Sequence, residues 1–248
     1  SLDGIAPIQE RLEEFFPYMA RVEEPLVSVV FGPSGEPPPP QTIGSQTAWS
    51  FSDDAGWNLV LAPEVATLAV GPQYESVNEI SERFRAGVGA LVEAGHVRRC
   101  NRLGVRYINV AELPPGDEEA WRRWYRPEFV GWVGGEILAG QLVASVTQTQ
   151  MASGGANGGG AGILGGMEGI IRQGVVPPNT LVPGLPAPVT TRAYLTDMDL
   201  FVAGPQPMSQ DELGQQFLVL HSQIDRFFRW TLSPAGEEYF GLMEVEEG

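Results

Sequence analysis

Apolar residues recur along the chain at two spacings, and each spacing predicts a different kind of element. Steps of three and four residues over 77–91 and 213–228 are typical of helices that lie on a sheet. Asp53 to Gly56 predict a hairpin loop. Runs of branched and aromatic residues predict strands at 25–32, 47–53, 57–62, 65–71, 97–112, 129–138, 141–151 and 190–203. Long helices beside such strands favour an α+β fold with antiparallel sheets.

Two nine-residue segments share a pattern that predicts an internal duplication. They are GPQYESVNE at 71–79 and GPQPMSQDE at 204–212, and in both the Gly-Pro pair predicts the end of a strand. Ser76 with Glu79, and Ser209 with Glu212, fit the capping box of a helix N-terminus. The apolar positions of the two following helices align as well. We therefore predict a duplicated unit of antiparallel β-sheet packed by a long helix, in two pseudo-repeated halves.

The predicted domain organisation follows from these elements. Apolar residues at helical spacing over 7–23, with Pro17 as a kink or stop, predict a helical extension that caps the domain or docks a partner. The PPPP stretch at 37–40 predicts a stiff loop. The segments are an N-terminal helical extension at 1–24, a first α+β half at 25–115, a second half at 116–232 with a glycine-rich insertion near 154–169, and an acidic tail at 233–248.

Charge narrows the classes of partner. The chain carries 31 acidic and 15 basic residues, a net charge of −16, and every basic residue is arginine. The absence of lysine excludes Schiff-base chemistry and a P-loop lysine, so the glycine-rich run favours a mobile hairpin tip or lid over a phosphate loop. A GC-rich coding sequence explains the missing lysine most simply, and selection against lysine-directed tagging is the alternative. The acidic balance argues against a nucleic-acid backbone as the main partner.

Cellular location is predicted from what the sequence lacks. No apolar run is long enough to cross a bilayer, and the N-terminus shows no signal-peptide pattern. The single Cys100 cannot form an internal disulfide, which fits a reducing compartment. We therefore expect a cytoplasmic protein that does not act at a membrane.

Candidate chemistry is sparse. His96, His221 and Cys100 are too few for a structural zinc site, and no Gly-x-Ser-x-Gly elbow is present. Asp197 and Asp199 share one face of a strand, where they suit either a magnesium site or an arginine partner. We favour the arginine partner and expect no cofactor, no metal and no catalytic residues. Whether the chain is an enzyme is left open, with the balance against it.

The stretch RLGVRYINV at 102–110 places an arginine inside a predicted strand. Gly104 and Arg106 share one face, and Tyr107 and Asn109 share the other. If the Arg106 face lies under the helices, the guanidinium needs a carboxylate, and Asp197 or Asp199 is the candidate that would tie the two halves together. Gly104 would leave room for a large neighbour such as a tryptophan. Tyr107, Asn109 and His221 are possible pocket residues.

The same stretch carries a family resemblance. With PLVSVVFG at 25–32, LTDMDLF at 195–201 and LHSQIDRFFRWTL at 220–232, it resembles a sporadically distributed bacterial and archaeal family marked by an RLGxRYIN strand. The resemblance spans most of 25–232 and implies no catalytic residues, because that family is uncharacterised. Its patchy distribution suggests a mobile or defence-associated setting.

Three functional hypotheses follow. The first is a non-enzymatic binding or adaptor protein that acts through a protein partner or as a homo-oligomer, in a bacterial conflict or defence system. The second is a small-molecule-binding domain or enzyme with a pocket between sheet and helices, lined by Tyr107, Trp49, Trp57 and Trp132. The third is a hydrolase that uses His221 with Asp197 and Asp199, although a histidine on an apolar stripe favours a core role.

Overall fold

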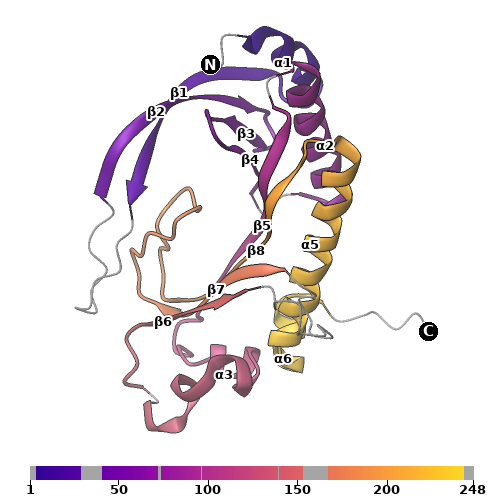
Figure 1. Cartoon of the computed structure of the whole chain (residues 1–248). Coiled ribbons are helices and arrows are strands. Elements are labelled where there is room, and N and C mark those ends of the chain that lie inside the picture. The colour runs from indigo at the N-terminus through magenta and orange to yellow at the C-terminus, as the bar shows by residue number, and fades with distance from the viewer. Residues whose placement is uncertain are drawn as a thin grey trace. The chain divides into compact units, whose positions relative to one another are not determined.

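A computed structural model of the chain describes residues 4–28, 41–71, 74–95, 97–138, 140–152 and 167–242 (Figure 1). The PPPP stretch at 37–40, residues 154–166 of the glycine-rich insertion and His96 lie outside the described residues. Part of the acidic tail, at 243–248, lies outside them too.

The described residues form an α+β structure with two four-stranded antiparallel sheets, which confirms the predicted fold class. The strand orders are β1-β2-β3-β4 and β5-β8-β7-β6. The strands are β1 (Tyr18–Ser28), β2 (Gln41–Ser52), β3 (Asn58–Leu61), β4 (Ala66–Ala69), β5 (Arg99–Glu112), β6 (Ser145–Met151), β7 (Glu168–Val176) and β8 (Ala193–Pro207). The helices are α1 (Ile5–Leu12), α2 (Val77–Glu93), α3 (Trp121–Trp124), α4 (Pro127–Val130), η1 (Gly131–Gly134), η2 (Glu136–Leu138), α5 (Gln210–Thr231) and α6 (Pro234–Tyr239).

The chain divides into two compact units, and each is assembled from separate stretches of sequence. Unit 1 comprises residues 1–100 and 205–215, and unit 2 comprises residues 101–204 and 216–248. The sequence predicts contiguous halves at 25–115 and 116–232 instead. The division differs because β5 hydrogen-bonds to β8, which joins residues far apart in the chain. The duplication itself stays a prediction.

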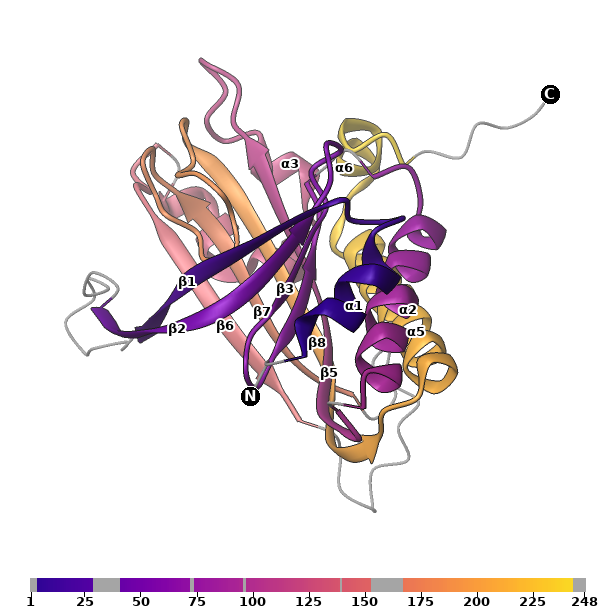
Figure 2. The ribbon, with the colours of Figure 1, turned by 90° about the horizontal axis from the view of Figure 1, so that it is seen from above.

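Unit 1 is organised around the hairpin that joins β2 and β3. The Asp53 carboxylate accepts hydrogen bonds from the backbone N–H groups of Ala55 and Trp57, both at 2.9 Å, which closes the predicted loop. The same carboxylate lies 3.1 Å from a guanidinium nitrogen of Arg83 on α2. The Arg83 guanidinium stands 4.7 Å from the centroid of the buried Trp57 ring. Helix α1 lies beside α2 in the same unit (Figure 2).

Both predicted capping boxes have a serine that accepts from the helix start. Ser76 Oγ accepts from the Glu79 N–H at 3.4 Å, and Ser209 Oγ accepts from the Glu212 N–H at 3.3 Å. The Glu79 carboxylate also accepts from the N–H of Glu75, at 3.1 Å. The apolar stripes behind the caps are buried as predicted: Ile80, Val88 and Leu91 on α2, and Leu213, Phe217, Leu220 and Ile224 on α5.

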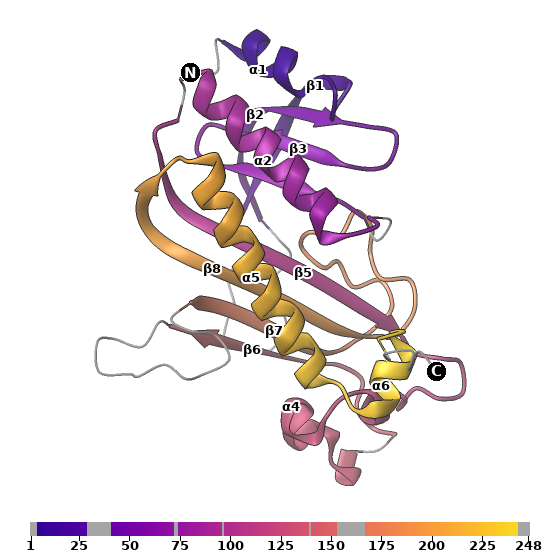
Figure 3. The same cartoon turned by 90° about the vertical axis from the view of Figure 1, so that its right-hand side faces the viewer.

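Unit 2 packs the later part of α5 against one face of the sheet β5-β8-β7-β6 (Figure 3). Its core is aromatic: the Trp121 and Tyr194 rings stack with centroids 5.3 Å apart, and Tyr125 lies 4.4 Å from Tyr194. Thr196 donates to the Tyr125 hydroxyl at 3.2 Å, so the polar atoms of this core are partly satisfied within it. Burial raises the pKa values of Tyr125 and Tyr194, which keeps both phenols neutral.

Three sequence predictions about elements are wrong. The helix predicted over 7–23 ends at Leu12, and Tyr18 begins β1, which pairs with β2; Pro17 lacks the N–H that a continuing helix needs. The strand predicted over 129–138 is the short helical series α4, η1 and η2, in which Gly131 adopts φ +64°. Gly204 and Pro205 do not end β8, because that strand turns at Gly204 (φ +113°) and continues to Pro207.

One strand was missed. Strand β7 follows the glycine-rich run and contains Gly169 and Gly174, which weaken the strand pattern. Gly174 is required: a Cβ built on it would lie 1.8 Å from the carbonyl oxygen of Ser145 on β6, and its φ is +147°. The absence of a side chain here lets β6 and β7 approach each other.

Candidate functional site

The two faces of β5 are opposite to the prediction. Leu103 and Val105 are buried, and the Tyr107 hydroxyl reaches His221 on α5, so this face lies toward the helix. Arg106 therefore points to the other face. Alternation alone leaves the choice open, because branched apolar residues follow on the Arg106 face too. There Ile108 and Val110 pack against a second buried cluster, which consists of Val176, Val182, Val189, Ala193 and Leu195.

Arg106 and Asp197 form a bidentate ion pair. Arg106 Nε donates to Asp197 Oδ1 at 2.7 Å, and Nη2 donates to Oδ2 at 2.8 Å and to the carbonyl oxygen of Pro183 at 2.7 Å. The hydrogen bond with Asp197 raises the pKa of Arg106 further, against an opposing effect of burial. Both residues belong to unit 2 and to neighbouring strands. The predicted ion pair is thus confirmed. It connects residues of the predicted halves 25–115 and 116–232, but within unit 2 it joins two strands of one sheet and does not tie the two compact units together.

A second arginine extends the pair into a row of side chains across the sheet. Arg172 on β7 donates from Nη1 to Asp197 Oδ2 at 3.0 Å and from Nε to Gln148 Oε1 on β6 at 2.8 Å. The row Arg106, Asp197, Arg172 and Gln148 thus crosses all four strands. Asp197 is only 1% exposed, and two guanidinium groups compensate its buried charge.

Asp199 belongs to a separate, more exposed pair. Its two carboxylate oxygens each lie 2.9 Å from Arg102 Nη2, and the Arg102 side chain is 48% exposed. The Arg102 guanidinium also lies over the Phe201 ring, 4.2 Å from its centroid. A Cβ on Gly104 would meet Arg102 Nη1 at 2.6 Å. The room that Gly104 leaves is therefore taken by an arginine and not by a tryptophan.

Tyr107 and His221, two of the three predicted pocket residues, are in contact with each other. The Tyr107 hydroxyl and His221 Nδ1 lie 2.9 Å apart, and the Phe217 ring stacks on the imidazole. Burial lowers the pKa of His221, and the charge of Asp225 opposes that effect. Asn109 is half-buried on the same face of β5. The imidazole is thus held between aromatic groups, and Asp197 and Asp199 lie on the opposite face of the sheet from it.

The tryptophans named for the alternative pocket do not share a site. Trp57 is buried in unit 1, Trp49 is half-buried on β2 of that unit, and Trp132 in unit 2 is 78% exposed. A core role explains Trp57, whereas the exposure of Trp132 needs another explanation.

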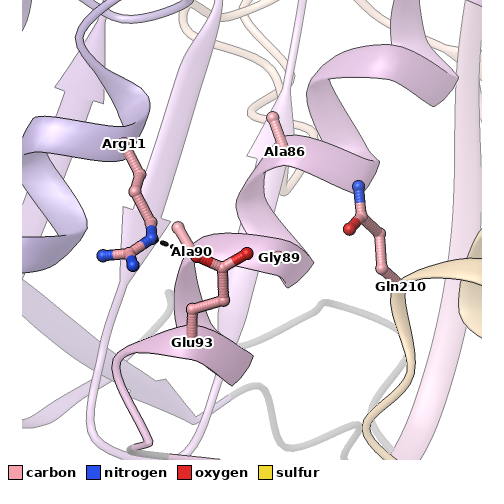
Figure 4. A pocket seen from close by; sticks show the side chains of 6 residues that line it. All are labelled: Arg11, Ala86, Gly89, Ala90, Glu93 and Gln210. Carbon is pink, nitrogen blue, oxygen red and sulfur yellow. Dashed lines mark hydrogen bonds and ion pairs between the residues drawn. The ribbon is translucent and has the colours of Figure 1, made fainter.

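Hollows in the described part of the chain include one in each unit. One of about 190 Å³ lies on α2 in unit 1 and is lined by Arg11, Ala86, Gly89, Ala90, Glu93 and Gln210 (Figure 4). The other, of about 240 Å³, lies in unit 2 and is lined by residues 140–143, Pro177, Pro178 and Arg192. Both are smaller than the roughly 300–1,000 Å³ of typical cofactor sites. Neither includes Tyr107, Asn109 or His221.

The described stretches also bear on metal binding and on membrane spanning. No group of three or more His, Cys, Asp or Glu side chains within the described stretches is placed to hold a metal ion. None of the helices described combines the length and the apolar character needed to span a bilayer.

Sequence reasoning did not find Arg172 or the edge position of β6. Arg172 lies in the strand that was missed, directly across from Asp197 in the register of β7 and β8. The alternation of Ser145–Met151 was noticed as part of a strand at 141–151, but its position at the edge of the sheet depends on pairing that the sequence does not reveal.

Comparison with protein-family models, with curated proteins and with solved structures finds no match to this chain.

Proposed function

We propose that the protein is a non-enzymatic binding or adaptor protein that takes a protein partner by adding a strand to β6. The observation that carries the proposal is the character of this edge. Strand β6 is the outer strand of its sheet, and its seven residues include no charged side chain. Its five central residues, 146–150, are all exposed.

Sheet edges normally carry features that prevent further pairing, such as charged residues or proline. The outer strand β1 of the other sheet carries Arg21 and Glu23. The β6 edge has neither proline nor charge, although the chain has a net charge of −16. An extended partner segment can therefore approach β6 without meeting a charged side chain on that strand. Main-chain hydrogen bonds between the two strands would supply the binding affinity.

Exposed apolar side chains adjoin this edge in sequence. Val146 of β6 is 53% exposed, Val143 just before it is 74% exposed, and Trp132 and Ile137 are 78% and 84% exposed. Val133, from the same helical stretch as Trp132, is buried, so that stretch is anchored in the core. Large apolar groups held in solvent by an anchored segment are typical of interaction surfaces. The partner is expected to be neutral or basic, with apolar side chains of its own.

The setting that we propose is a bacterial conflict or defence system, in a cytoplasmic compartment. The defence setting rests on the family resemblance of the RLGVRYINV stretch. The cytoplasmic compartment rests on the single cysteine. We propose no second function for the predicted catalytic groups. Asp197 accepts hydrogen bonds from two arginines, and the His221 ring contacts Tyr107 and Phe217.

The test uses a photo-crosslinking amino acid at Gln150 on β6 and, as a control position, at Asn78 on α2. In cells of the source organism, Gln150 should crosslink to a defined protein that Asn78 does not capture. The double variant Thr147→Lys, Thr149→Lys should abolish that product, because lysines block edge pairing. The matched variant Asn78→Lys, Val92→Lys adds the same charge on exposed positions of α2 and should retain it. Equal capture at both positions, or capture insensitive to the β6 lysines, would contradict the proposal.

A further inference from the structure

The hollow of about 240 Å³ in unit 2 lies where three strands of the sheet begin or end. Ser145 begins β6, Val176 ends β7 and Ala193 begins β8, and the register places Ser145, Val175 and Tyr194 in one row. The connections at this end of the sheet supply the residues that line it. Residues 140–143 precede β6, Pro177 and Pro178 follow β7, and Arg192 precedes β8.

Arg192 is the charged residue of this hollow, and its charge is not compensated. Its Nη2 donates to the carbonyl oxygen of Leu142, and its Nε is buried without a hydrogen-bond partner among the described residues. No carboxylate of the described chain lies within ion-pair distance of it. Arg106 and Arg172 in the same sheet are both paired with Asp197. A half-buried guanidinium without a carboxylate is unexpected in a chain with twice as many acidic as basic residues.

The site is preorganised on both sides. The Arg192 backbone is held where its carbonyl oxygen accepts from the N–H of Leu113 at 2.9 Å. The proline wall is held by Thr180 Oγ1, which donates to the carbonyl oxygen of Pro177 at 2.7 Å. The turn behind it is closed by the N–H of Asn179, which donates to the carbonyl oxygen of Val189 at 2.7 Å. These hydrogen bonds fix the backbone beside the hollow, which lowers the ordering cost of binding.

We propose that this hollow binds a carboxylate that carries a small apolar group. The guanidinium offers the planar donor geometry that suits a carboxylate. A single cation matches a monoanion, whereas a phosphate dianion would remain half uncompensated in a chain of net charge −16. Leu142, Val143 and the two proline rings provide an apolar surface for the attached group, and the volume fits about one small residue.

Two sources supply this chemistry: a free short-chain carboxylic acid and the C-terminus of a peptide. A strand that paired antiparallel with β6 would have its C-terminal end beside Ser145, at the same end of the sheet as the hollow. The site does not require strand addition, however, because its walls and its cation all belong to this chain. The inference therefore stands or falls separately from the proposed function.

The experiment follows the Nε–Hε NMR signals of the arginines in ¹⁵N-labelled protein. The Arg192 signal is assigned by its loss in Arg192→Gln, and Arg226→Gln, at an exposed arginine of the same unit, is the matched control. Sodium isobutyrate is titrated against sodium chloride at constant ionic strength. N-acetyl-Ala-Val with a free carboxylate is compared with the same peptide as an amide.

The Arg192 signal should shift saturably with isobutyrate and not with chloride, while the Arg226 signal shifts equally with both. The free peptide should bind at least tenfold more tightly than its amide. Tighter binding of the free peptide than of isobutyrate identifies a C-terminus as the natural ligand class, and the reverse order identifies a small acid. Absence of a saturable shift at Arg192, or equal binding of peptide and amide, would overturn the proposal without bearing on strand addition at β6.

Discussion

Arg106 on β5 and Asp197 on β8 share two charge-assisted hydrogen bonds, of 2.7 and 2.8 Å, and Arg172 approaches the same carboxylate from the other side at 3.0 Å. In this row of the described sheet, Asp197 is the single carboxylate that pairs with both Arg106 and Arg172. Its side chain is 1% exposed. Its removal would leave two like charges facing each other, on side chains that are 32% and 28% exposed. The carboxylate is therefore a structural requirement of the sheet.

Asp197→Asn should lower the free energy of unfolding by about 3 kcal/mol, because it preserves shape while removing the buried charge that both arginines need. Asp199→Asn is the matched variant, since its partner Arg102 is 48% exposed, and it should cost less than about 1 kcal/mol. Urea denaturation of the two variants measures which of them loses more free energy of unfolding. Equal losses would show that the shared carboxylate has no special role.

Gly174→Ala should destabilise unit 2 by about 2 kcal/mol or more, because the new Cβ would collide with the Ser145 carbonyl oxygen at a φ of +147°. Hydrogen exchange of the β6 amides should accelerate at the same time. Gly71→Ala is the control: none of the described residues lies within 4 Å of its Cβ position, and we expect a change within about 0.5 kcal/mol. Unchanged exchange in β6 would contradict the close approach of the two strands.

His221 should make the protein less stable as the pH falls below about 6.5. Burial lowers its pKa in the folded state, so the unfolded chain binds the proton more readily, and its contribution to stability is complete only above the ordinary value of 6.5. In the protonated imidazole Nδ1 can only donate to the Tyr107 hydroxyl. The free energy of unfolding should therefore drop between pH 7.5 and 5.5 in the wild type.

His221→Gln should reduce that drop, whereas Asp225→Asn, which removes the charge that favours the protonated form, should enlarge it. Guanidinium denaturation at the two pH values provides the comparison. A drop of the same size in wild type and His221→Gln would assign the pH dependence to the carboxylates.

Trp132→Ala should leave stability within about 0.5 kcal/mol of wild type, because the side chain is 78% exposed. Trp121→Ala, at a fully buried position that stacks on Tyr194, should cost about 3–5 kcal/mol. Thermal unfolding separates the two variants. If Trp132 serves the proposed interaction surface, its variant should also lose the product crosslinked from Gln150; a large loss of stability instead would make Trp132 a core residue.

The local elements could be predicted from the residues alone, because their causes lie within a few residues. Ser76 and Ser209 mark the helix starts through hydrogen bonds to residues three places on, and Asp53 closes a hairpin with the N–H groups that follow it. Apolar periodicity likewise determined the stripes of α2 and α5. These features sufficed for the α+β class.

Features that depend on pairing between distant strands became visible only in the folded chain. Only the hydrogen bonding of β5 to β8 brings Arg106 to Asp197 within one sheet, and only the position of α5 decides that Tyr107 and not Arg106 faces the helix. Arg172, the β6 edge and the unpaired charge of Arg192 follow from the same arrangement. Alternation gives a strand two faces and two edges, but the free energy that chooses among them comes from packing partners elsewhere in the chain.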